Sequence, residues 1–213
     1  MPISDLQLAA LLCSRVCHDL ISPVGAIANG LEVLNDDDDE MMREHAMSLI
    51  QSSAQQASAK LQFARLAFGA AGAAGDNIDL GDAREVTLGL LKSGKVTLEW
   101  PTDGQSLPKN AVKLLLNLIL IGIDAIPRGG SLHVSGNDAD GGLTIEIRAE
   151  GEKAKVADDI RDMLLSDETP PLEDMSARSI QPHLSALVAR ELGVELSVST
   201  QEEAVSIVAK KAA

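Results

Sequence analysis

The sequence predicts an α+β protein in which an N-terminal helical hairpin precedes an α/β sandwich. Three observations predict this fold: a heptad pattern near the N-terminus, a glycine- and alanine-rich stretch at residues 69–75, and a second half in which helix and strand patterns alternate. The 213 residues suit one large domain or two small ones. We expect a helical domain at residues 1–70 and an α/β domain at residues 76–213.

The first helix is expected to begin after Ser4, which forms a capping-box pattern with Gln7. Apolar residues then recur in alternating steps of four and three, which is a heptad seam that runs through Asn29-Gly30 without a break. The seam consists of Cys13, Cys17, Leu20, Val24, Ile27, Leu31 and Leu34. It predicts that both cysteines lie inward as core thiols rather than in a disulfide.

Four aspartates at residues 36–39 are expected to end this helix, because they suit a solvated turn and the positive N-terminal end of the next helix. The second helix is expected at residues 40–68. Its predicted inward residues are Ala46, Leu49, Ser53, Ala57, Leu61 and Ala64. Two helices cannot close a core, so we expect a second copy to complete a four-helix bundle across a two-fold axis. The alternative is that the second half of the chain covers the hairpin.

The second half predicts helices near residues 82–91, 108–126, 156–165 and 182–192. Strands are predicted at residues 96–100, 132–135, 143–148, 195–199 and 204–208. Residues 138–142 have the composition of a hairpin turn, and Pro170-Pro171 indicates a loop. This pattern describes a mixed sheet with helices on one face.

Composition argues against several classes of partner. With 18 basic and 32 acidic residues the net charge is −14, so most of the surface repels nucleic acid. No signal peptide is recognised, and polar residues interrupt the longest apolar run, at residues 111–126. The cysteines and histidines do not form a metal-ligand pattern. We therefore expect a cytoplasmic protein without a metal that binds neither nucleic acid nor membrane.

The position of His18 predicts chemistry. It follows Cys17 by about 100° around the helix and should therefore face solvent. A neutral imidazole is a good nucleophile and forms a labile phosphoramidate, so an exposed histidine suits a phosphoryl acceptor. Asp19 could fix the imidazole tautomer or act as a general base, and Arg15 could offset the charge of a phosphoryl group. An exposed histidine beside an acid is also common on ordinary solvated helices.

Small and polar residues continue the face of the helix around the histidine. They include Ser14, Ser22, Gly25 and Asn29. A large partner could press flat against such a face. Pro23 lacks the amide hydrogen that would bond to the carbonyl of Asp19, so we expect a local bend or a freed carbonyl beside His18.

The run His18-Asp19-Leu20-Ile21-Ser22-Pro23-Val24 resembles the H-box of sensor histidine kinases, His-Glu/Asp-Leu-x-Thr/Ser-Pro-Leu. Residues 14–34 and the block Leu-Gln-Phe-Ala-Arg-Leu-Ala-Phe-Gly-Ala at residues 61–70 resemble the ChpT-type histidine phosphotransferases of alphaproteobacteria. This resemblance covers nearly the whole chain. It implies a homodimer with a four-helix phosphotransfer bundle and C-terminal domains shaped like the ATP-binding fold of histidine kinases.

The second half resembles a degenerate form of that ATP-binding domain. Residues 114–122 look like the kinase N-box, and Ile121 stands where kinases have the asparagine that holds Mg²⁺. In the following Asp-x-Gly-x-Gly motif, Ala149 takes the aspartate position and Lys153 the second glycine. The glycine-rich lid is also missing, since residues 179–183 read Ser-Ile-Gln-Pro-His. The resemblance therefore implies that the chain binds no ATP.

Together these features imply a histidine phosphotransferase in a multistep phosphorelay, with receiver domains of a hybrid histidine kinase and of cell-cycle response regulators as partners. Mg²⁺ would come with the receiver. The expected catalytic residues are His18 as acceptor, Asp19, Arg15 and Ser22, and the expected partner contacts are Ser14, Ile21, Gly25 and Asn29. Two alternatives stay open: an ATP-dependent histidine kinase, and a non-enzymatic dimeric regulator or scaffold that docks on receivers or kinases.

Overall fold

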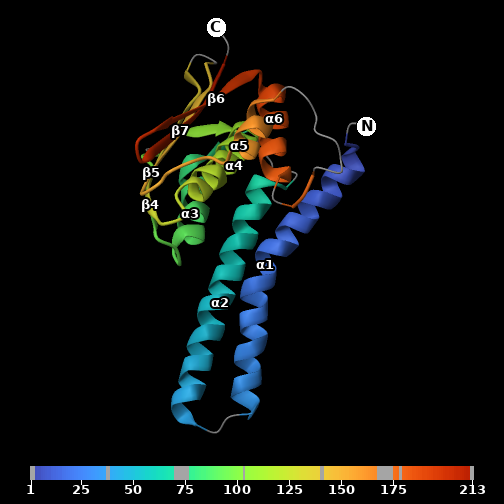
Figure 1. The fold of residues 1–213 in the computed structure, drawn as a ribbon, viewed down its shortest axis with the longest axis vertical. Coiled ribbons are helices and arrows are strands. Elements are labelled where there is room, and N and C mark those ends of the chain that lie inside the picture. The colour runs from blue at the N-terminus through green and yellow to red at the C-terminus, as the bar shows by residue number, and fades with distance from the viewer. Residues whose placement is uncertain are drawn as a thin grey trace.

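The computed structural model describes residues 3–36, 39–69, 77–102, 104–139, 142–166, 175–177 and 179–211. Helices α1 (Asp5–Asp36) and α2 (Glu40–Ala67) form a long antiparallel hairpin that projects from an α/β domain (Figure 1). This confirms the predicted fold class. The boundaries at residues 1–70 and 76–213 stay a prediction, because residues 70–76 lie outside the described residues.

Local sequence signals fix the ends of the hairpin helices. The amide of Ser4 donates to Gln7 Oε1 at 2.9 Å, and the amide of Gln7 donates to Ser4 Oγ at 3.3 Å, which confirms the capping box. At the start of α2, Asp39 Oδ1 accepts a hydrogen bond from the amide of Met41 at 2.9 Å. As predicted, α1 continues as a helix through Asn29-Gly30.

The contact between α1 and α2 uses only part of the predicted seam, of which Leu20, Ile27 and Leu34 are half-buried. Pro23 and Gly30, seven residues apart on one face of α1, are buried, whereas Val24 and Leu31 are 54% and 49% exposed. At Gly30 the helices lie so close that a Cβ atom would stand 2.7 Å from Ile50 Cγ1. Val24 and Leu31 do not face α2, because the close approach between the helices is made through Gly30.

Other inward predictions on the hairpin are also corrected. Cys13 and Cys17 are exposed free thiols rather than core residues. On α2, Ala46 and Ser53 are buried as predicted, but Leu49 and Leu61 are 43% and 50% exposed. The hairpin thus leaves a substantial part of its apolar surface uncovered.

The C-terminal domain is built on a five-stranded mixed sheet with the order β2-β4-β5-β7-β6. Strand β2 (Val96–Glu99) is parallel to β4 (Gly130–Asn137), whereas β5 (Thr144–Glu150), β7 (Ala204–Lys211) and β6 (Val194–Gln201) continue the sheet antiparallel. Helices α3 (Leu80–Leu91), α4 (Lys109–Ala125), α5 (Asp158–Leu165) and α6 (Ile180–Leu192) lie on one side of it (Figure 1).

The predicted helices and strands of the second half are confirmed, with ends that differ by a few residues. A small sheet of β1 (Asn77–Asp79) and β3 (Ser106–Pro108) was not predicted, since three residues carry too short a pattern. Pro170-Pro171 and residues 140–141 of the predicted turn lie outside the described residues.

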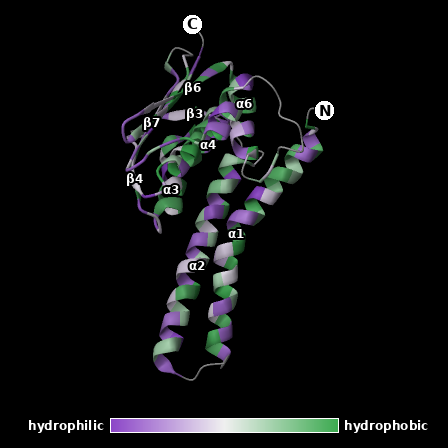
Figure 2. Ribbon diagram, in the orientation of Figure 1, coloured by the Kyte–Doolittle hydropathy of each residue, from purple (hydrophilic) through white to green (hydrophobic). Residues whose placement is uncertain are grey.

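Helix α4 forms the centre of the core and is strongly hydrophobic, as Figure 2 shows. The end of α2 joins the same core, because Phe63 and Ala67 are 2% and 0% exposed within it. Asn117 Nδ2, on α4, donates to the carbonyl of Ala67 at 2.8 Å. The second half therefore covers only the end of the hairpin.

Among the described helices, one (residues 5–35) has the length and apolar composition needed to cross a membrane. In the structure this helix pairs with α2, and it carries the ionic cluster of Arg15 and Asp19. Charges inside a bilayer are costly.

Candidate functional site

His18 lies on α1 with its side chain 76% exposed, which confirms the predicted orientation. Its Nδ1 atom is 3.4 Å from Asp19 Oδ1. Its Nε2 atom makes no hydrogen bond with any described residue. The imidazole therefore presents one nitrogen to Asp19 and the other to an approaching partner.

Asp19 links several groups at this point of the helix. Its Oδ2 atom pairs with Arg15 Nε at 3.0 Å, one turn back along α1. The Arg15 side chain is 14% exposed and that of Asp19 is 34% exposed, so solvent screens this pair only in part. Arg15 thus holds Asp19 in place next to the histidine.

Because Pro23 has no amide hydrogen, the backbone carbonyl of Asp19 lacks its usual hydrogen bond within the helix, as predicted. It accepts a hydrogen bond from α2 instead. Lys60 Nζ, on α2, donates to this carbonyl at 2.8 Å. Sequence reasoning missed Lys60. The available signal was its position on α2, three residues after Ala57 and four before Ala64, where a lysine on an inward face needs an acceptor.

A groove of about 910 Å³ extends from the His18 face of the hairpin to the C-terminal domain. Three basic side chains and two acidic ones line it. They are Arg15, Lys60 and Lys95, and Asp19 and Asp124. In a chain with a net charge of −14, this is a local excess of positive charge next to the histidine. Such a surface favours an acidic partner.

The predicted partner contacts Ser14, Ile21, Gly25 and Asn29 lie outside this groove and are all exposed. Ser22, predicted as a catalytic residue, is exposed and also lies outside the groove. Nothing lies within 4 Å of the place that a Cβ atom on Gly25 would occupy, so the helix surface is flat there. The structure therefore gathers His18, Asp19 and Arg15 in the groove and leaves the other predicted residues beside it.

The remaining histidines are less suited to accept a group from a large partner. His183 is 1% exposed in α6, and burial lowers its pKa, with a smaller contribution from the charge of Arg190. His133 Nδ1 lies 3.1 Å from Glu99 Oε2 on the sheet. His45 is exposed on α2 but is absent from the groove lining.

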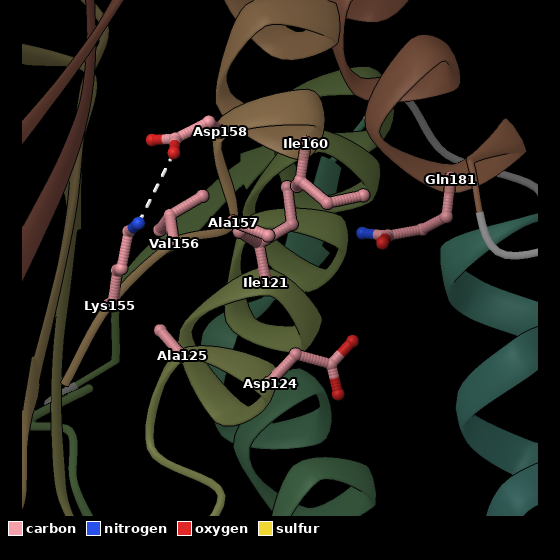
Figure 3. Close-up of a pocket in the computed structure, with 9 residues that line it drawn as sticks. All are labelled: Ile121, Asp124, Ala125, Lys155, Val156, Ala157, Asp158, Ile160 and Gln181. Atoms are coloured by element: carbon pink, nitrogen blue, oxygen red, sulfur yellow. Dashed lines mark hydrogen bonds and ion pairs between the residues drawn. The ribbon is translucent and has the colours of Figure 1, made fainter. Parts of the chain in front are cut away.

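A second cavity, of about 430 Å³, opens between α4, α5 and α6 (Figure 3). It is lined by Ile121, the residue that stands where kinases hold Mg²⁺, and by two carboxylates, Asp124 and Asp158. Asp158 pairs with Lys155 at 3.2 Å, the one lysine of the lining. Ala149 is fully buried in β5. The charged side chains of this cavity are thus two carboxylates and one ammonium group.

An exposed histidine held beside an aspartate on a helical hairpin, joined to an α/β domain, is the arrangement expected of a histidine phosphotransferase. A family model described as "Histidine phosphotransferase C-terminal domain" matches residues 80–204, and the chain belongs to this family. The protein phosphotransferase ChpT of Brucella abortus (strain 2308) is 48% identical over 203 residues, which cover 94% of each chain. The family and this relative assign the chain phosphotransferase activity in a phosphorelay.

One solved structure is similar over nearly the whole chain. The 1.7 Å structure of a bacterial phosphotransferase has a TM-score of 0.87 and 44% identity, and the match covers 98% of both chains. The histidine kinase domain of a blue-light activated kinase from Erythrobacter litoralis EL346 has a TM-score of 0.49 and 13% identity, covering 88% of this chain and 95% of that one.

Proposed function

We propose that the chain carries a phosphoryl group on His18 and passes it between aspartates of receiver domains, without using ATP. The observation that supports this proposal is the exposed imidazole at the edge of the groove, with Nδ1 turned to Asp19 and Nε2 open. The receiver domains of a hybrid histidine kinase and of response regulators are the partners that fit this chemistry.

In the transfer step, the lone pair of His18 Nε2 attacks the phosphorus of the receiver's aspartyl phosphate. The P–N bond forms while the P–O bond breaks, and the aspartate carboxylate leaves with the bonding electron pair. The imidazole ring becomes cationic and keeps its proton on Nδ1, where Asp19 stabilises it. In the second transfer, an aspartate of another receiver attacks the phosphorus and the imidazole leaves with the electron pair. When bound by the receiver, Mg²⁺ would offset the phosphoryl charge.

The receiver docks across the hairpin and the groove. Its acidic phosphorylation site meets the groove, where Lys95 supplies positive charge for docking. The flat surface around Gly25 accepts the rest of the partner, with contacts from Ser14, Ile21 and Asn29. We place this relay in the cytoplasm, since Cys13 and Cys17 are exposed free thiols that suit a reducing compartment.

The experiment compares two radiolabelled phosphodonors. One is a receiver domain charged with labelled acetyl phosphate, and the other is labelled ATP with Mg²⁺. We expect label from the receiver to reach the wild-type chain and not His18→Ala, whose folding is checked by circular dichroism. Equal labelling of both variants would show that His18 is not the acceptor. Labelling of His18 by ATP alone would establish the kinase alternative, and no transfer at all would leave the scaffold alternative.

We infer that a second copy of the chain completes the hairpin. Helical periodicity places Val24 and Leu31 of α1 on the same side of the hairpin as Met47 and Leu61 of α2, and all four are between 45% and 54% exposed. A continuous apolar stripe of this kind suits a four-helix bundle with two-fold symmetry.

Analytical ultracentrifugation tests this dimer. Val24→Glu should reduce the sedimenting mass to that of one chain, because it places a charge in the centre of the stripe. Leu49→Glu is the matched control, since Leu49 is exposed to a similar degree on the opposite side of the hairpin. A monomeric wild-type chain, or equal dissociation by the two variants, would contradict this interface.

A further inference from the structure

We propose that Lys60 is a positioning residue for phosphoryl transfer at His18. The carbonyl of Asp19, which Pro23 leaves without a helical donor, accepts a hydrogen bond from the Lys60 ammonium. Asp19 is the residue after His18, so this bond connects α1 to α2 beside the histidine. Lys60 also supplies a positive charge there that no acid pairs with among the described residues. This inference rests on the proposed transfer through His18 and adds a residue from the other helix of the hairpin.

The hydrogen bond from Lys60 to Asp19 pairs a donor and an acceptor that would each be unfavourable without a partner. Inside a helix, a carbonyl accepts a hydrogen bond from the amide four residues later. For Asp19 that residue is Pro23, which has no amide hydrogen. Lys60 occupies a half-buried position on α2, where its ammonium needs an acceptor. The bond of 2.8 Å between them, across 41 residues of sequence, answers both needs at the level of His18.

The charge of Lys60 is not cancelled by an acid. Among the described residues, no carboxylate lies within ion-pair distance of its ammonium, whereas neighbouring Arg15 is paired with Asp19. Lys60 and His18 line the same groove. A phosphoryl group on the histidine brings about two negative charges to this groove. A fixed cation nearby stabilises that charge without making or breaking a bond.

Three variants separate a charge effect from a simple tie between the helices. Lys60→Met removes the charge and the hydrogen bond but keeps an unbranched side chain that favours helix. Lys60→Arg keeps both the charge and a donor. Pro23→Ala leaves Lys60 in place but restores an amide hydrogen that competes for the carbonyl of Asp19. Urea unfolding followed by circular dichroism reports the stability of each variant.

The measurement is single-turnover transfer from a receiver domain charged with acetyl phosphate, over a range of receiver concentrations. We expect Lys60→Met to lower the maximal rate about tenfold, the effect of losing one charge-assisted contact, with little change in the half-saturating concentration. Lys60→Arg should restore the rate. Transfer by Lys60→Met at the wild-type rate would refute the proposal. Equal slowing by Lys60→Arg and Lys60→Met, in step with lost stability, would show a structural tie instead.

A double-mutant cycle tests the role of the freed carbonyl. Pro23→Ala should slow transfer when Lys60 is present. In the Lys60→Met background it should slow transfer little further, because both changes break the same contact. Fully additive effects would show that the carbonyl does not act through Lys60. Failure of the wild-type chain to accept label on His18 would refute the proposed function itself, which keeps the two failures distinct.

Discussion

The two glycines in the second half of α1 have opposite surroundings, and this difference predicts opposite effects of alanine. Gly25 faces open space, with nothing within 4 Å of an added Cβ atom. At Gly30 the added Cβ atom would meet Ile50 Cγ1 at 2.7 Å and the carbonyl oxygen of Ala46 at 3.2 Å. Alanine at each position therefore tests whether the hairpin has the described close approach.

The magnitudes follow from helix propensity and packing. Replacing glycine by alanine inside a helix stabilises it by about 0.5–1 kcal/mol, and Gly25→Ala should gain this in full. Gly30→Ala gains the same term but forces α2 outward, at an overpacking cost of about 1–3 kcal/mol. Gly30→Ala should therefore be less stable than Gly25→Ala by about 1–3 kcal/mol, or roughly 2–12 °C in melting temperature for a chain of this size.

Urea unfolding at one fixed protein concentration measures both variants against the wild-type chain, since any dimer makes stability depend on concentration. The midpoint should rise for Gly25→Ala and fall, or stay near the wild-type value, for Gly30→Ala. An equal rise for both variants would mean that α2 does not pack against Gly30, and the assigned seam would then be wrong.

Two further predictions concern the C-terminal domain. Asn117→Ala should lower the free energy of unfolding by about 1–3 kcal/mol, because the carbonyl of Ala67 loses its donor inside the core. Urea titration measures this loss. A loss well below that range would show that water or another donor replaces Asn117. Burial lowers the pKa of His183 below its usual 6.5, so the unfolded chain binds this proton first and stability is lost as the pH falls below 6.5. His183→Gln should lose less stability than the wild-type chain between pH 7.5 and 5.5, with a difference of at most about 1.4 kcal/mol per pH unit; identical losses would show that His183 does not contribute.

The sequence predicted the elements of the fold well because most of them carry strong periodic patterns. The helix at residues 108–126 has an apolar run with a clear stop signal, and it is found at Lys109–Ala125. The seam of the hairpin was harder to predict. Val24 and Leu31 were predicted to face inward, but the close approach between the helices is made through Gly30. That approach depends on Ile50 and Ala46 of the other helix, which no local pattern on α1 describes.

The site was predictable in part for a similar reason. His18, Asp19 and Arg15 lie within one turn of a single helix, so spacing alone brings them together. Because Pro23 has no amide hydrogen, the sequence also predicted that the carbonyl of Asp19 lacks its helical donor. The donor to that carbonyl, Lys60, lies on the other helix, and its contact depends on the register of the hairpin. Residues brought together by tertiary packing stay hidden from a local analysis.

The end of α2 lies within the core of the C-terminal domain, through Phe63, Ala67 and the bond from Asn117. A donor domain in the same chain would have to swing toward the histidine and withdraw after each transfer. A donor that arrives as a separate molecule needs no such hinge. Here the two walls of the groove are already joined, so a visiting protein does not have to order them and retains more of its binding free energy. A preorganised surface of this kind makes repeated exchange of partners easier.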